Sequence, residues 1–296
     1  MKTENLAGGP TSAAASLPAI GVYARAIAVT SMGLALTACA TATPGRQGQL
    51  SSYEGVTKTS TLRTKAYLRA DKAMLEKAHT FQLEPVRFAD GVGSSITGAQ
   101  REVVANAASR ALCAALSQRL EAPPPGVAPD LLVRATITGF SPTGRTVAGA
   151  SFVLSHLSPV PFTPRIPWGL GSFSAEAEAV DGAGHQVAAL VWERGADAFS
   201  SKPRVSVIGD AYQLSVIFGH DMGELVATGE NPIHNVSLPS LSHHRKPAAS
   251  CAVFGKGPGM TGFVAGRLAA APEWLDRPAK PPPADDHASP PADHTQ

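Results

Sequence analysis

Aromatic residues are scarce in this sequence, and no stretch of it is rich in charge of one sign. Phe, Trp and Tyr make up 6% of the chain, and the formal net charge of the 296 residues is only +2. Proteins that bind nucleic acid usually carry a basic patch or a strongly basic domain. The sequence has neither, so we expect no nucleic-acid partner.

Recognised catalytic and metal-binding motifs are also missing. We find no G-x-S-x-G elbow, no P-loop and no dinucleotide-binding fingerprint. A metal site needs several ligands held at a defined geometry. The nine histidines are isolated, as at His185, paired with an acid on a predicted helix, as at His220, or close to proline, as at His243 and His244. We therefore expect no metal and no cofactor. Whether the protein is an enzyme stays uncertain, with a non-enzymatic role favoured.

No hydrophobic run is long enough for a stable transmembrane helix. Residues 26–38 form an uncharged stretch of the length of a signal-peptide core, whereas a spanning helix needs about 20 residues. The residues that follow, Leu36-Thr37-Ala38-Cys39, resemble the lipobox of bacterial lipoproteins. That resemblance implies removal of residues 1–38 and acylation of Cys39. Ala40, where Asp would favour the inner membrane, implies a lipid anchor on the periplasmic face of the outer membrane.

The chain contains only three cysteines, Cys39, Cys113 and Cys251. If Cys39 carries lipid, two thiols remain, and the oxidising periplasm permits a disulfide between them. Cys113, however, lies among Ala and Leu in a helical pattern, where cysteine commonly serves as a small buried hydrophobic residue. Both alternatives stay open, and the unpaired state is favoured.

Composition divides the chain after the signal into three parts. Residues 39–65 are rich in Thr, Ser, Gly and Gln and are predicted to be a flexible tether. Residues 66–229 contain the periodic apolar patterns of a folded domain. Residues 230–296 are dominated by Pro, His, Ala and Ser, and we expect a largely disordered tail that buries too little apolar surface to fold.

The folded part is predicted to be of the α/β class (α+β type), with helices packed on a small mixed sheet. Its elements follow the order strand, helix, strand, hairpin, helix. Thr97 and Gln100 form a capping box, Asp210 is a candidate N-cap, and Gly229 fits the position that ends a helix. The expected elements are a short helix or irregular segment at 66–79, a strand at 81–88 broken at Pro85, a helix at 98–120, a strand at 130–140, a hairpin at 172–180 and 186–194, and a helix at 211–228.

Two acidic residues and three aromatic residues are the candidate binding surface. Glu176 and Glu178 share one face of the predicted strand 172–180, and paired carboxylates can perform acid–base chemistry or bind a cation. A solvated strand face is the simpler and favoured interpretation. Trp168, Phe173 and Trp192 could supply aromatic contact area, although burial of both tryptophans in the core is favoured.

Several short motifs resemble the DUF3313 family of bacterial lipoproteins, whose function is unknown. The motifs are Ser52-Tyr53, Tyr67-Leu68-Arg69, Glu84-Pro85-Val86, Ala175-Glu176-Ala177-Glu178 and Asp181-Gly182. The resemblance covers about residues 39–229. It implies an envelope lipoprotein and offers no catalytic residue.

Three functional hypotheses follow from these observations. The first is a non-enzymatic binding or assembly module of the cell envelope, with the hairpin 172–194 and the loop 141–171 as its working surface. The second is a hydrolase-like enzyme for a small molecule that uses the acidic strand face. The third is a structural or stress lipoprotein without a specific ligand.

Overall fold

A computed structural model describes residues 46–144, 170–197, 206–233, 249–257 and 271–276. Cys39 and Trp168 lie outside these ranges. The strands are β1 (Thr57–Ser60), β2 (Thr64–Ala70), β3 (Phe81–Leu83), β4 (Arg87–Phe88), β5 (Leu131–Ser141), β6 (Ser172–Asp181) and β7 (Gln186–Gly195). The helices are α2 (Lys72–Lys77), α3 (Gly98–Leu116), α5 (Gly209–Thr228), the 3-10 helix η2 (Ala249–Phe254) and α7 (Pro272–Leu275).

The seven described strands form one mixed sheet, which confirms the predicted fold class. Its order is β1-β2-β7-β6-β5-β3, and β4 pairs separately with β5. The two short strands run parallel to β5, and the other pairs are antiparallel. The expected strand at 81–88 is split at Glu84-Pro85-Val86, because proline has no backbone N–H for a sheet hydrogen bond.

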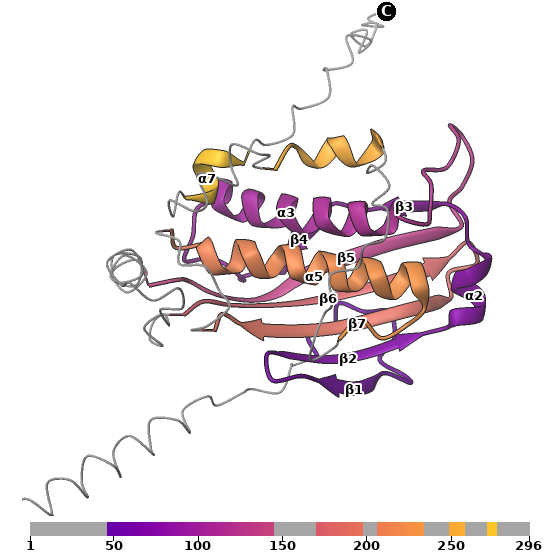
Figure 1. Ribbon diagram of the computed structural model, residues 1–296, viewed down its shortest axis with the longest axis horizontal. Coiled ribbons are helices and arrows are strands. Elements are labelled where there is room, and N and C mark those ends of the chain that lie inside the picture. The colour runs from indigo at the N-terminus through magenta and orange to yellow at the C-terminus, as the bar shows by residue number, and fades with distance from the viewer. Residues whose placement is uncertain (1–45, 145–169, 198–205, 234–248, 258–270, 277–296) are drawn as a thin grey trace, which may run out of the picture. The chain divides into compact units, whose positions relative to one another are not determined.

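Helices α3 and α5 lie side by side over one face of the sheet (Figure 1). This face carries the apolar half of the alternating strand patterns. Phe173 and alternate alanines of β6 are fully buried there, next to Val133 and Ile137 of β5. Burying this apolar surface is the main favourable contribution to the fold, at about 25 cal/mol per Å². The polar half of β6, with Glu176 and Glu178, consequently points to the opposite face.

The helix ends agree in part with the sequence. The Thr97 hydroxyl accepts from the Gln100 backbone amide and Gln100 returns the bond, so the capping box is confirmed. Gly229 ends α5 with a left-handed backbone, φ 69°. The Asp210 prediction was wrong: α5 begins at Gly209, and the Asp210 carboxylate accepts from the Gly171 amide at 2.9 Å, fixing the start of β6.

The region predicted as tether and short helix contains two strands of the sheet. Residues 57–60 and 64–70 form an antiparallel pair, and β2 continues the sheet by pairing with β7. The helix is shorter than expected and starts only at Lys72. The local pattern was misleading because β2 is stabilised by backbone hydrogen bonds to β7, more than 110 residues away, and β1 pairs in turn with β2.

The expectation for the C-terminal region also needs correction. Cys113 of α3 and Cys251 of η2 form a disulfide with Cα atoms 5.7 Å apart, so the favoured unpaired state was wrong. Further along, the Arg110 guanidinium pairs with the Asp276 carboxylate, which also accepts from the Tyr212 hydroxyl at 2.9 Å. Covalent and ionic contacts order these short segments where apolar burial alone would not.

Candidate functional site

Glu176 and Glu178 lie on the face of the sheet opposite the helices, yet both are buried. They are only 1% and 3% exposed, so the favoured interpretation of a solvated strand face was wrong. They are covered by residues 47–53, which we call the strap. The strap crosses the sheet ahead of β1 and presents backbone N–H groups to both carboxylates.

The Glu176 carboxylate accepts three hydrogen bonds from the strap. The Gln47 amide donates to Oε1 at 2.6 Å, and the Gln49 amide donates to Oε2 at 2.9 Å. The Tyr53 hydroxyl also donates to Oε2, at 2.5 Å. Burial raises the pKa of Tyr53, and the hydrogen bond and negative charge of Glu176 raise it further, so this phenol remains a donor.

Glu178 is held by both the strap and the sheet. Its Oε2 accepts from the amide and the hydroxyl of Ser51, at 2.8 and 2.6 Å, and from the Gln186 side chain at 2.8 Å. The Arg134 guanidinium donates to Oε1 at 2.7 Å. Burial alone would raise the pKa of Glu178, but the bonds from Ser51 and Gln186 and the charge of Arg134 outweigh it and lower this pKa.

The strap also makes apolar and cation–π contacts. Leu50 is buried against Ala189 and Val191 of β7, with Tyr53 and Tyr67 packed around them. The Arg46 guanidinium lies over the Tyr53 and Tyr67 rings, 5.5 and 5.8 Å from their centroids.

A buried carboxylate needs hydrogen-bond donors of the kind that surround Glu176 and Glu178, because an unpaired charge in the interior is very costly. The two acids therefore serve to hold the strap in place.

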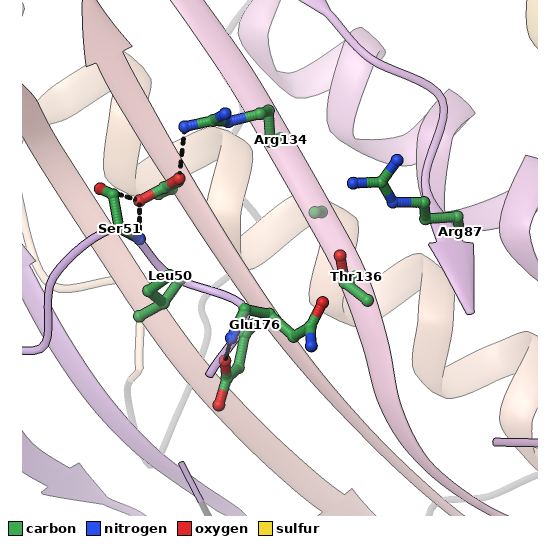
Figure 2. Close-up of a pocket in the computed structure, with 9 residues that line it drawn as sticks. Leu50, Ser51, Arg87, Arg134, Thr136 and Glu176 are labelled. Carbon is green, nitrogen blue, oxygen red and sulfur yellow. Dashed lines mark hydrogen bonds and ion pairs between the residues drawn. The ribbon is translucent and has the colours of Figure 1, made fainter. Parts of the chain in front are cut away.

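The strap forms one wall of a pocket of about 260 Å³. Leu50 and Ser51 line it from the strap, whereas Arg134 and Thr136 line it from β5 and Arg87 from β4 (Figure 2). Arg87 is exposed, and within the described ranges its side chain has no hydrogen-bond or ion-pair partner. The pocket thus combines the Arg134–Glu178 ion pair with one further cation, Arg87, and one further carboxylate, that of Glu176.

A second pocket, of about 460 Å³, has the same wall. It shares Gln49, Arg87 and Thr136 with the first and is otherwise lined chiefly by residues that follow β4, including Asp90. The two pockets together form a polar groove between the strap and β4–β5. This groove is the candidate functional site.

Two of the predicted surface residues, Phe173 and Trp192, do not reach this groove. Phe173 and Trp192 are fully buried under α5, where they pack against Phe218 with ring centroids 5.8 to 6.0 Å apart. The Trp192 indole donates to Asp221 at 2.8 Å. These two residues form the core rather than a binding surface. Trp168 and the proposed lipidation residue Cys39 lie outside the described residues.

The residues that build the groove were not singled out from the sequence. Arg134 and Thr136 fall within the strand predicted at 130–140, but nothing in the sequence distinguished them from other polar residues of that strand. Arg87 follows a proline break, and the strap belonged to the predicted tether. The sequence signal that could have pointed to the groove was the pair Glu176 and Glu178. If a sheet face that carries two acids is covered, the acids require hydrogen-bond donors from another segment.

A separate cleft of about 670 Å³ lies between the start of α3 and α7. Its rim includes Trp274, which is 81% exposed. The Glu273 carboxylate in this cleft is engaged by the Gln100 amide and the Ser206 hydroxyl, at 2.9 and 2.8 Å.

Two other kinds of site are absent from the described part of the chain. No group of three or more His, Cys, Asp or Glu residues there could hold a metal ion. None of the helices described there combines the length and the apolar character of a membrane span.

Comparison with known proteins gives a family and distant structural similarities. Two structures of a PelC dodecamer from Paraburkholderia phytofirmans, one of them a point variant, each share 9% identity with the chain, with TM-scores of 0.33 and, for the variant, 0.31. They cover 56% of this chain and 98–99% of their own. A DUF4136 family protein from Bacteroides thetaiotaomicron has 12% identity and a TM-score of 0.26, and covers 57% of this chain and 99% of its own. No curated protein matches the sequence.

The family comparison is the informative one. Residues 45–222, more than half of the chain, match the family described as "Protein of unknown function (DUF3313)". The match begins just before the strap and includes all seven strands of the sheet. The chain therefore belongs to the DUF3313 family.

Proposed function

We propose that this protein is a lipid-anchored, non-enzymatic binding module of the bacterial envelope, attached through Cys39 to the periplasmic face of the outer membrane. The observation that carries the proposal is the strap. The chain that follows the lipobox-like sequence is fixed to the sheet by Glu176 and Glu178 within a few residues of Cys39. A membrane anchor at that cysteine would thus be coupled directly to the folded domain.

The fixed strap limits how far the domain can move from the membrane. Only eight residue steps separate Cys39 from Gln47, the first strap residue whose amide is bound. A fully extended chain spans at most about 3.3–3.6 Å per residue, so this connection reaches no more than roughly 30 Å. The predicted tether of residues 39–65 would have reached several times farther.

Glu176 and Glu178 are poorly placed to act as general acid and base, which argues against the alternative of an acid–base enzyme on this strand face. A general acid or base must reach the substrate and exchange a proton with it. Both carboxylates are instead buried, and their oxygens accept from strap donors, Arg134 and Gln186. The bonds around Glu178 also lower its pKa, which is opposite to the shift that a general acid working near neutral pH needs.

Metabolic labelling tests the anchor. Cells that express the full chain are grown with labelled palmitate, and wild type is compared with Cys39→Ser. We expect label in the wild type only, and recovery of the wild type with outer-membrane fractions. Cys251→Ser is the matched control, because it replaces a cysteine outside the lipobox. Equal labelling of wild type and Cys39→Ser would overturn the lipid anchor.

Crosslinked purification from detergent-solubilised membranes tests the binding role. We expect an envelope component to copurify with wild type, and its recovery to fall when the groove residue Arg87 is changed to Gln. A change on the opposite side of the fold, Glu102→Gln, is the control. Recovery that is unaffected by Arg87→Gln, or of the protein alone, would contradict a binding role for this groove.

A further inference from the structure

The groove between the strap and β4–β5 contains three donor groups without partners. The Arg87 guanidinium has none within the described residues, and the same holds for the Thr136 hydroxyl, although Thr136 is only 7% exposed. The Nε of Arg134 is buried and also lacks an acceptor, while the Nη2 of that residue is engaged by Glu178. Of the three, only the Arg134 Nε is fully buried, and a buried donor without an acceptor is rare in proteins. The Arg87 guanidinium and the Thr136 hydroxyl are open to solvent and therefore available to a ligand.

Figure 2 shows how these groups are arranged. The Arg87 guanidinium extends from β4 toward β5, and the Thr136 hydroxyl points to the same space. Arg134 borders that space from above in this view. The Glu176 carboxylate points the other way, toward its strap donors. The Arg87 and Thr136 donors thus face the open part of the pocket, which Glu176 and Glu178 also line.

Arg87 is the lining cation that is available to a ligand, although the two arginines and two glutamates of the pocket balance in charge. The carboxylate of Glu178 already balances the Arg134 guanidinium at 2.7 Å. Glu176 has no cation beside it in the described residues, but its two oxygens are occupied by the strap. Arg87 is left without a counter-charge in the described part of the chain. Guanidinium groups bind carboxylate and phosphate with two parallel hydrogen bonds, a geometry that suits neither water nor a neutral sugar as well.

The sizes and lining of the two pockets indicate the size and charge of the part of the ligand beyond its anionic group. The pocket of about 260 Å³ has room for one phosphate or carboxylate and its first attached atoms. The adjoining pocket of about 460 Å³ shares Arg87 and Thr136 and can take a larger remainder. Asp90 lines that second pocket, where it would repel another negative charge. The remainder is therefore expected to be neutral or cationic.

We propose that the groove binds one phosphate or carboxylate group, held by Arg87 and Thr136 beside the Arg134–Glu178 pair, on a ligand whose remainder is uncharged or positive. This inference rests on the proposed role as a binding module but not on lipidation of Cys39. Two sources present this chemistry: a soluble anion and the phosphodiester of a lipid headgroup.

Calorimetric titration of the full-length protein in a neutral detergent tests the proposal. The probes are inorganic phosphate and glycerophosphoglycerol, a headgroup phosphodiester without acyl chains. We expect both to bind the wild type, and Arg87→Gln to weaken binding by about tenfold or more, because a hydrogen bond to a charged group contributes about 1.5–3 kcal/mol. Thr136→Val, which keeps the side-chain shape, should weaken binding by a smaller factor of about five.

The controls separate loss of the site from loss of the fold. Lys77→Gln removes an exposed cation on α2 and should leave binding unchanged, and thermal unfolding should show that every variant keeps the wild-type midpoint. Tighter binding of the phosphodiester assigns the site to a lipid headgroup, and tighter binding of phosphate assigns it to a soluble anion. Absence of binding to wild type up to about 50 mM of either probe, or equal binding by Arg87→Gln, would overturn the proposal. Neither result would affect the palmitate test of the anchor.

Discussion

The backbone amide of Gln47 donates a 2.6 Å hydrogen bond to the carboxylate of Glu176, 129 residues farther along the chain. This contact joins the segment that follows the proposed anchor to a central strand of the sheet. It changes the interpretation of two features at once. The predicted tether becomes part of the fold, and the predicted solvent-facing acid becomes the residue that fixes it.

Glu176→Gln should release the strap. The glutamine side chain keeps its shape, but its NH2 group would face the donors of Gln47, Gln49 or Tyr53, so at least one buried donor loses its acceptor. Such a loss costs about 1–3 kcal/mol. Urea unfolding should show this decrease, and limited proteolysis should cleave within residues 47–53 faster than in wild type. Glu102→Gln, an exposed change on α3, should do neither. Unchanged cleavage in Glu176→Gln would show that the carboxylate does not hold the strap.

Removing the disulfide should destabilise the protein. Cys113 and Cys251 are 138 residues apart in sequence, and crosslinks that close long loops are typically worth about 2–4 kcal/mol. We expect the double variant Cys113→Ala/Cys251→Ala to unfold at lower urea concentration, and reduction of the wild type to have a similar effect. Thiol titration of the unreduced, denatured wild type should find neither cysteine free. Two reactive thiols would contradict the pairing.

Gly219→Ala should be strongly destabilising although alanine favours helix. A Cβ at this position of α5 would lie 2.5 Å from the Ala108 carbonyl oxygen and 2.8 Å from the Leu112 amide nitrogen of α3. The helices would have to separate, at a cost of about 1–3 kcal/mol that exceeds the gain in helix propensity of about 1 kcal/mol. Thermal unfolding checks this result. Gly182→Ala, in the β6–β7 turn with open space around it, is the control and should change stability by less than about 0.5 kcal/mol.

Stability should fall as the pH rises from about 4 to about 7. Burial raises the pKa of Asp221 to about 7, despite the opposing effects of the Trp192 hydrogen bond and the Arg194 charge. In this range the folded protein binds a proton that the unfolded chain has released, so raising the pH favours unfolding through this group. Asp221→Asn keeps an acceptor for Trp192 and carries no charge. We expect it to remove this part of the pH dependence and to stabilise the protein at pH 8 by about 1–2 kcal/mol. A parallel pH profile for the two proteins would contradict the raised pKa.

The sequence by itself determined the fold class, the helix α3 with its capping box at Thr97, the end of α5 at Gly229, and the β6–β7 hairpin. Each of these depends on interactions within a few residues or on a strict alternation of apolar and polar side chains. The alternation from Phe173 to Ala179 indicates a strand with one apolar face in the core. The family assignment could be anticipated for the same reason, because short motifs carry it.

Only the tertiary structure decided the strap, the groove and the disulfide between α3 and η2. Glu176 and Glu178 look like solvent-facing residues until amides from residues 47–51 are placed over them. Arg87 becomes a candidate ligand-binding residue only when β4 pairs with β5. Cys113 looks like a core residue until η2 brings Cys251 to it, from 138 positions farther along the chain. No local propensity encodes pairings between residues so far apart in sequence, because their free energy arises only when the whole sheet and its helices have formed.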